Sequence, residues 1–156
     1  MEQNQGKVIL LSIAIDKYQD STFEDLQNAV FDSQELTNVL EKKYKISKKV
    51  PIHDKNATRT SILNNFSDLQ QEIDDEDTLI VFWNGHGEVH NNKAYFLIHE
   101  SKNKDKDKGL STWFSHDELL SLLKYIRAKH IVLLINSCYA GELLKEKQRN
   151  MIIKNI

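Results

Sequence analysis

The sequence contains a single cysteine among 156 residues, so no internal disulfide can stabilise it. One unpaired cysteine also suits a reducing compartment, and we therefore expect a cytoplasmic location.

Long hydrophobic runs are absent as well. The apolar stretch Val8–Ile15 has eight residues, whereas a membrane-spanning helix needs about 20. It also lacks the positively charged start and small-residue cleavage site of a signal peptide. We expect no membrane partner.

Neither sign of charge predominates. The chain has 21 Lys and Arg against 23 Asp and Glu, which gives a net charge of −2. Such a mixed surface lacks the basic footprint that nucleic acids and anionic lipids require, so we do not expect nucleic acid as a partner. The length and the 40% hydrophobic content fit one soluble domain with a single core.

What the sequence does contain is an alternation of strand and helix patterns. Apolar runs of strand length occur at Val8–Ile15, Val50–His53, Leu79–Trp83 and Ile131–Ile135. The first and last hardly alternate, which is typical of strands buried on both faces of a parallel sheet. Helical spacing occupies 26–40, 62–73 and 119–126, with Thr58 or Ser61 and then Ser115 as N-caps. The pattern predicts an α/β sandwich with a mostly parallel sheet.

One connection stands out by its charge. The stretch SKNKDKDKG at 101–109 is nearly all charged and predicts an exposed, mobile loop. We expect its lysines to face solvent and to bind no ligand.

Two of the predicted strands end in residues that can perform chemistry. One runs into Asn84-Gly85-His86-Gly87 and the other into Asn136-Ser137-Cys138. Because ligands and catalytic groups gather beyond the carboxyl ends of parallel strands, His86 and Cys138 could face each other as acid–base group and thiol nucleophile. The N–H groups of Gly87 and Cys138 could then form an oxyanion hole. A helix expected at 142–148 would lower the pKa of the thiol.

Each of these residues also has a structural interpretation. A lone cysteine is most often a core residue, and a histidine between glycines can simply belong to a turn. Their occurrence together, at two strand ends 52 positions apart, favours a catalytic pair. The remaining histidines lack such a context, and we expect structural or surface roles for His53, His90, His99, His116 and His130.

A strand ending in GHG, followed by a strand ending in SCYAG, resembles the caspase-like cysteine proteases of the peptidase C14 family. The sequence NSCYAG at 136–141 is closer to the DSCxSG of metacaspases and bacterial caspase homologues than to animal caspases. LSIAIDKY at 11–18 resembles the IGINxY-like end of the family's first strand, and LQNAVFDS at 26–33 resembles its LxGAxxDA helix start. The resemblance spans about residues 8 to 145 and implies the caspase–hemoglobinase α/β/α sandwich.

The resemblance implies a cysteine endopeptidase that forms an acyl-enzyme. Cys138 would be the nucleophile, His86 the general base and acid, and the amides of Gly87 and Cys138 the oxyanion hole. In metacaspases two aspartates line the S1 pocket for a basic P1 side chain. Asp32 matches one of them, but the other position is Asn136 here. We expect a preference for Arg or Lys at P1, with one carboxylate fewer to support it.

We expect no metal and no cofactor. One cysteine and scattered histidines do not give the ligand spacing of zinc sites. Part of the metacaspase family depends on calcium, but Asp117 and Glu118 match only part of the acidic stretch concerned, and His116 precedes them. Calcium needs six to eight oxygen ligands, so calcium activation has little support.

The chain ends 18 residues after Cys138, and the resemblance therefore implies that 1–156 is a large-subunit (p20-type) domain whose small-subunit portion is absent. It could be a self-processed fragment, a truncated chain, or a minimal protein completed by oligomerisation. Basic residues near the end, Lys145, Lys147, Arg149 and Lys154, would suit autoprocessing of a zymogen. Expected partners are a protein or peptide substrate and a small-subunit segment or further domains. The alternative is a catalytically idle scaffold with a caspase-like fold.

Overall fold

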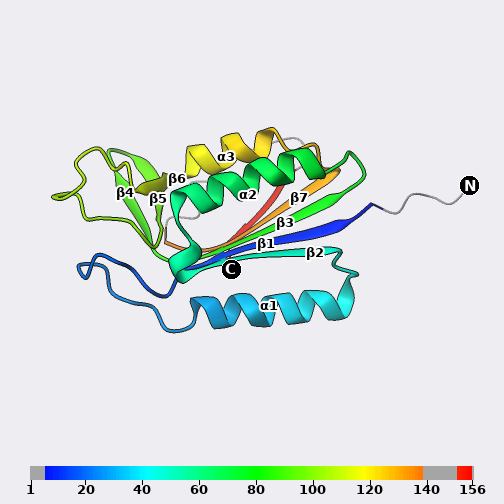
Figure 1. Cartoon of the computed structure of the whole chain (residues 1–156), viewed down its shortest axis with the longest axis horizontal. Helices are drawn as coiled ribbons and strands as arrows, with labels where there is room; N and C mark the ends of the chain where they lie inside the picture. The colour runs from blue at the N-terminus through cyan, green and yellow to red at the C-terminus, as the bar shows by residue number, and fades with distance from the viewer. Residues whose placement is uncertain (1–5, 139–150, 156) are drawn as a thin grey trace, which may run out of the picture.

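A five-stranded sheet forms the centre of the protein in this computed structural model, which describes residues 6–138 and 151–155 (Figure 1). Its strands lie in the order β2-β1-β3-β7-β8, and every neighbouring pair is parallel. Their bounds are β1 (Val8–Ala14), β2 (Lys48–His53), β3 (Thr78–Asn84), β7 (His130–Asn136) and β8 (Met151–Asn155). The predicted parallel sheet is confirmed, but β8 was not expected.

Helices cover the sheet from both sides. Helix α1 (Ala29–Lys43) lies on one face, and α2 (Arg59–Glu72) and α3 (His116–Lys124) lie on the other (Figure 1). The expected caps are present, because Thr58 Oγ1 accepts the N–H of Ser61 at 3.2 Å and Ser115 Oγ accepts the N–H of Glu118 at 3.1 Å. A short 3₁₀ turn, η1 (Asp54–Asn56), follows β2. The expected α/β/α sandwich is confirmed.

The main core lies between the sheet and helices α2 and α3. Alternate residues of β1, β3 and β7 point to this side and are almost completely buried, which follows from the two-residue period of a strand. They pack in one cluster with the apolar stripe of α2. The cluster includes Ile9, Leu11, Ile13, Leu79, Val81, Trp83, Ile131, Leu133, Ile135, Ile62, Phe66 and Leu69.

The face on the α1 side is covered less completely. Helix α1 contacts β1 and β3, and it leaves Val132 and Leu134 of β7 half-buried. Val39 falls within the helical spacing at 26–40, but its side chain is not part of the core, since its exposed fraction is 49%. Only Ala29 and Ser33 of α1 are fully buried. The helix lies over the β1–β3 side of the sheet.

A second, antiparallel sheet was not predicted. It has the order β4-β5-β6, with β4 (Gly87–His90), β5 (Lys93–Leu97) and β6 (Trp113–Ser115). The β4–β5 hairpin turns at Asn91 and Asn92, whose φ angles of 49° and 61° are those that asparagine tolerates in two-residue hairpin turns. Trp83 stacks on Phe96 with ring centroids 4.2 Å apart. This contact joins the small sheet to the main core.

The charged loop before β6 departs in part from expectation. Its lysines are exposed, as predicted. Lys106 in addition pairs its ammonium group with the buried carboxylate of Asp20 at 3.0 Å, which the sequence did not predict. Within the described ranges, no helix has both the length and the apolar character needed to cross a bilayer. The helix expected at 142–148 and the basic residues Lys145, Lys147 and Arg149 lie outside the described residues.

Candidate active site

Strands β3 and β7 end level with each other at one edge of the main sheet. Asn84, the last residue of β3, pairs in register with Asn136, the last residue of β7. The next residue continues the contact, since the N–H of Gly85 donates to the carbonyl oxygen of Asn136 at 3.2 Å. His86 and Cys138 each come two residues after this matched pair. The register therefore brings both segments to the same edge of the sheet.

Gly87 lies directly against the backbone that carries Cys138. A methyl group added at Gly87 would lie 2.4 Å from the carbonyl oxygen of Cys138 and 2.6 Å from Oγ of Ser137. Real Cβ atoms do not tolerate such contacts, so any side chain at this position would displace the cysteine segment. Glycine is required here by close approach, and the two segments predicted to carry the chemistry are in contact.

The N–H of Gly87 points out of the small sheet. The N–H of Leu97 donates to the carbonyl oxygen of His86 at 3.0 Å, so His86 and Leu97 hold the position of a hydrogen-bonded pair, although the N–H of His86 donates to Tyr18 and not to Leu97. Since such pairs alternate with non-hydrogen-bonded pairs in antiparallel strands, Gly87 and its partner Phe96 belong to the second kind. The Gly87 amide is therefore directed away from β5, as a donor to an external oxyanion must be.

The imidazole of His86 is held by groups from the loop after β1. Its Nε2 lies 2.7 Å from the carbonyl oxygen of Glu24. Because a carbonyl can only accept, we assign the ring hydrogen to Nε2, which leaves Nδ1 as the unprotonated nitrogen of the neutral ring. The ring also lies against Tyr18, with centroids 5.0 Å apart. The contacts with Glu24 and Tyr18 thus hold the ring from two sides.

Tyr18 supports the same histidine through its hydroxyl group, which accepts the backbone N–H of His86 at 2.9 Å. Burial raises the pKa of Tyr18 above its usual range, so the phenol stays protonated and neutral. A methyl group at Gly85 would lie 3.1 Å from the Tyr18 hydroxyl oxygen. Gly85 therefore leaves room for the hydrogen bond between the Tyr18 hydroxyl and the backbone of His86.

Cys138 carries a free and exposed thiol. It lies two residues beyond the end of β7, so the rigid strand fixes the chain while the side chain stays accessible. The helix expected to follow it, and with it the expected effect on the thiol pKa, falls outside the described residues.

The residues proposed for the S1 pocket lie on two elements. Asn136 ends β7, and Asp32 lies in the first turn of α1; both are exposed. No hydrogen bond or ion pair joins their side chains in the part of the chain that the structure describes. The start of α1 is nevertheless tied to the same sheet edge, because Asn84 Nδ2 donates to the carbonyl oxygen of Ala29 at 3.2 Å.

Three residues around the site were missed by sequence reasoning: Asp16, Tyr18 and Glu24. Asp16 accepts the first N–H groups of α1, and Tyr18 and Glu24 hold His86. The stretch at 11–18 contained the signal for Asp16 and Tyr18, since polar residues directly follow a buried strand. Glu24 acts through its backbone carbonyl. Every amino acid has this group, so the residue type at position 24 gives no signal in the sequence.

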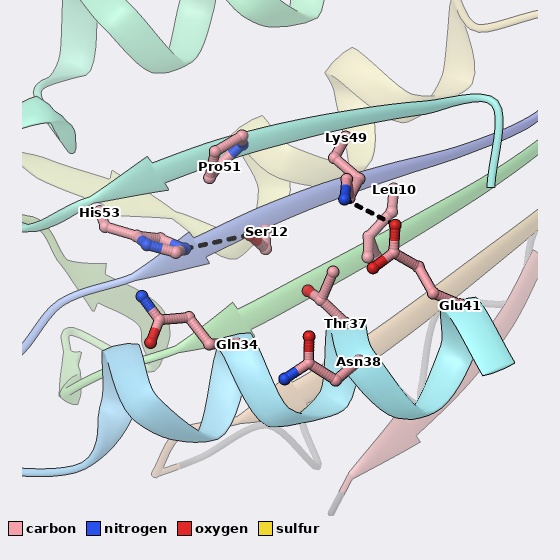
Figure 2. A pocket seen from close by; sticks show the side chains of 9 residues that line it. All are labelled: Leu10, Ser12, Gln34, Thr37, Asn38, Glu41, Lys49, Pro51 and His53. Carbon is pink, nitrogen blue, oxygen red and sulfur yellow. Dashed lines mark hydrogen bonds and ion pairs between the residues drawn. The ribbon is translucent and has the colours of Figure 1, made fainter.

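The hollow drawn in Figure 2 lies elsewhere, between α1 and the β1–β2 side of the sheet, and has a volume of about 320 Å³. Its lining includes neither His86 nor Cys138 and consists of Leu10, Ser12, Gln34, Thr37, Asn38, Glu41, Lys49, Pro51 and His53. His53 Nε2 lies 3.1 Å from Ser12 Oγ (Figure 2), and burial lowers the pKa of this imidazole. Among the described residues, no three His, Cys, Asp or Glu side chains group to hold a metal ion.

Comparison with known proteins gives a family match and fold matches. A family model described as Caspase domain (peptidase C14) matches residues 7–154. Protein GSU0716 from Geobacter sulfurreducens superposes with a TM-score of 0.67 at 13% identity, over 94% of this chain and 57% of that chain. The Drosophila initiator caspase Dronc gives 0.61 at 13% identity, over 86% and 50%. The structure of pro-sf-caspase-1 gives 0.56 at 14% identity, over 94% and 49%.

These solved structures share the fold with this chain, which spans about half of the length of each. No curated protein matches the sequence.

Proposed function

Because its sequence matches the caspase domain over residues 7–154, this chain belongs to the caspase domain family, and on that premise we propose that it is a cysteine endopeptidase acting through Cys138 and His86. The observation that carries the proposal is the contact of Gly87 with the Cys138 backbone, together with the bond that occupies Nε2 of His86. Both observations support the proposal, because the segment of the exposed thiol contacts the segment of the histidine and Nδ1 of the ring is not the nitrogen bound to Glu24.

In the proposed reaction, Nδ1 of His86 takes the proton of the Cys138 thiol, and the thiolate attacks the carbonyl carbon of the scissile peptide bond. The N–H groups of Gly87 and Cys138 donate to the oxyanion of the tetrahedral intermediate. The protonated His86 then gives its proton to the leaving amine as the C–N bond breaks, which leaves a thioester on Cys138. A water molecule deprotonated by Nδ1 hydrolyses the thioester and restores the thiol.

We propose Arg or Lys as the P1 side chain of the substrate, with Asp32 and Asn136 in the S1 pocket. Asp32 is an exposed carboxylate on the first turn of α1, and Asn136 lies at the strand end two residues before the nucleophile. One carboxylate and one amide would bind a cation less strongly than two carboxylates. Cleavage of libraries that vary P1 between Arg, Lys and Asp tests this preference.

A further segment of chain would complete the domain. The sheet face beside α1 has a hollow of about 550 Å³ over β3, β7 and β8, lined mostly by apolar side chains such as Ile80, Val132 and Leu134. Parallel sheets are normally buried on both faces, and this chain spans about half of the solved caspase structures that it matches. We propose that a small-subunit segment covers this face, and that processing or binding of this segment activates a zymogen in the cytoplasm.

The rate of Cys138 alkylation as a function of pH tests the proposed function. In the wild type we expect the thiol to be alkylated faster at neutral pH than a free thiol, and His86→Ala should slow the reaction. Cys138→Ala serves as the blank for the reagent. An alkylation rate that is the same in the wild type and in His86→Ala would contradict the proposed protease function and favour a catalytically idle scaffold with a caspase fold.

A further inference from the structure

The carboxylate of Asp20 is buried in the loop between β1 and α1, with a side chain that is 3% exposed. Its Oδ2 accepts the N–H of Asn103 at 3.0 Å, and its Oδ1 accepts the N–H and hydroxyl of Thr22 at 3.1 and 2.8 Å. Lys106 Nζ lies 3.0 Å from both oxygens. These donors, first of all the Asn103 amide, hold the pKa of Asp20 far below its usual range. Asp20 is a permanent anion that ties two loops together.

The second of these loops has a defined shape of its own. Asn103 Oδ1 accepts the N–H groups of Asp105 and Lys106 at 3.1 and 3.2 Å. Further along, Asp107 accepts four hydrogen bonds from the backbone and hydroxyl groups of Ser111 and Thr112. Lys106 and Asn103 therefore meet Asp20 from a structured turn, not from a free tail. Both loops lie at the same end of the molecule (Figure 1).

The turn that begins at Asp20 leads directly to Glu24, whose carbonyl holds the histidine. The N–H of Phe23 donates to the carbonyl oxygen of Asp20 at 3.0 Å, which closes a turn directly before Glu24. The Phe23 ring packs edge-on against Tyr18 and Trp113, with centroid distances of 6.1 and 6.4 Å. On the other side of Glu24, the N–H of Leu26 donates to the carbonyl oxygen of Asp16 at 2.8 Å. The Glu24 carbonyl that binds Nε2 of His86 is thus fixed from both sides.

We propose that Asp20 and Lys106 are positioning residues for the histidine of the dyad. They latch the loop at 101–112 to the turn at 20–23, and the turn sets the place of the carbonyl that orients the imidazole. This inference rests on the proposed function, because orienting His86 matters for catalysis only if His86 exchanges a proton with Cys138. Neither residue touches the reacting atoms. They act through Glu24.

Release of the latch would free the Glu24 carbonyl on its upstream side. The hydrogen at Nε2 of His86 would then exchange more readily with water, and the ring would spend less time in the orientation that directs Nδ1 toward the thiol. Proton transfer from Cys138 depends on that geometry, and small misplacements of a catalytic group are costly. Both the exchange of the Nε2 hydrogen and the reactivity of the thiol should respond.

The test measures both quantities in the full chain. Nitrogen-15 NMR follows exchange of the His86 Nε2 hydrogen, and alkylation at neutral pH follows Cys138. We expect Asp20→Asn to speed the exchange and to slow alkylation, each on the order of tenfold. Lys106→Met should act in the same direction but less, since its side chain is 55% exposed and such pairs are weak. Lys106→Arg should restore the wild-type values.

Lys108→Met is the matched control, because Lys108 is an exposed lysine of the same loop whose side chain forms no ion pair or hydrogen bond among the described residues. We expect it to change both readouts by less than about twofold, as for most substitutions away from a site. Lys106→Met, at a half-exposed position, keeps the test valid if Asp20→Asn does not fold. An unchanged His86 exchange rate in both Asp20→Asn and Lys106→Met would overturn the inference, as would an effect of Lys108→Met equal to that of Lys106→Met. If His86→Ala slows alkylation but substitutions at Asp20 and Lys106 leave the His86 exchange rate unchanged, only this inference fails. If His86→Ala leaves the alkylation rate unchanged, the proposed function fails as well.

Discussion

The carboxylate of Asp16 accepts the backbone N–H of Ala29 at 2.7 Å, although thirteen residues separate them in the chain. Its second oxygen accepts the N–H of Val30 at 3.2 Å. Asn28, the residue at the ordinary cap position, makes no such bond with its side chain. The first turn of α1, which carries Asp32, is therefore capped from the end of β1, and this contact fixes the helix over the edge where the candidate site lies.

Asp16→Ala should lower the free energy of unfolding by about 1 kcal/mol, the usual effect of losing a side-chain cap. Denaturant unfolding measures this change. Asp16→Asn retains an acceptor oxygen and should lose less. Equal losses in the two variants would contradict the capping role.

Gly87→Ala should strongly reduce the alkylation rate of Cys138 and any peptidase activity, because the added methyl group would overlap the Cys138 carbonyl oxygen. Gly109→Ala is the matched control, since a methyl group there meets nothing within 4 Å. Alkylation and thermal unfolding of both variants check the prediction. A Gly87→Ala protein with a normal thiol would show that the two segments are not in contact.

Phe66→Ala should cost about 3–5 kcal/mol of stability, because it empties a fully buried position at the centre of the α2 interface. Phe31→Ala removes the same side chain from a position that is 58% exposed on α1, and should cost less than about 0.5 kcal/mol. Urea unfolding of the two variants measures the difference. Similar losses would mean that Phe31 is covered in solution.

His53 should make the protein less stable as the pH falls below 6.5. Burial, the largest cause, holds the pKa of its imidazole below the ordinary value of 6.5 in the folded chain. Between these two pKa values the unfolded chain binds a proton that the folded chain does not, so the free energy of unfolding falls with decreasing pH there and levels off below. Above 6.5 the group makes no contribution.

Unfolding of His53→Gln over pH 5 to 7 tests this dependence, which should become flatter than in the wild type. His130→Gln, at an exposed histidine at the start of β7, should leave the slope unchanged. An unaltered slope in His53→Gln would assign the effect to other groups.

Strands β1, β3 and β7 could be predicted because each is a nearly continuous apolar run, which is the pattern of parallel strands buried on both faces. The caps at Thr58 and Ser115 were visible for a similar reason, since one hydroxyl and its N–H partner three residues on are local in the chain. Local rules covered most of the framework and both strand ends of the candidate site.

What the sequence did not reveal depends on contacts between distant segments. The small sheet has strands of three to five residues, too short to show a period, although the asparagine pair between β4 and β5 indicated its hairpin. Val39 has the helical spacing of a core residue but is 49% exposed on α1. Lys106 belongs to a charged run, and only the folded chain shows that it meets Asp20.

His86 is oriented by a backbone carbonyl, and almost any amino acid can supply one. The glutamate at position 24 can therefore be replaced during evolution without disturbing the histidine. A change in the backbone path around position 24 is not tolerated. A complete substitution scan should find position 24 permissive and its structural neighbours Asp16, Asp20 and Phe23 restrictive. A functional contact of this kind is inherited as the shape of a loop.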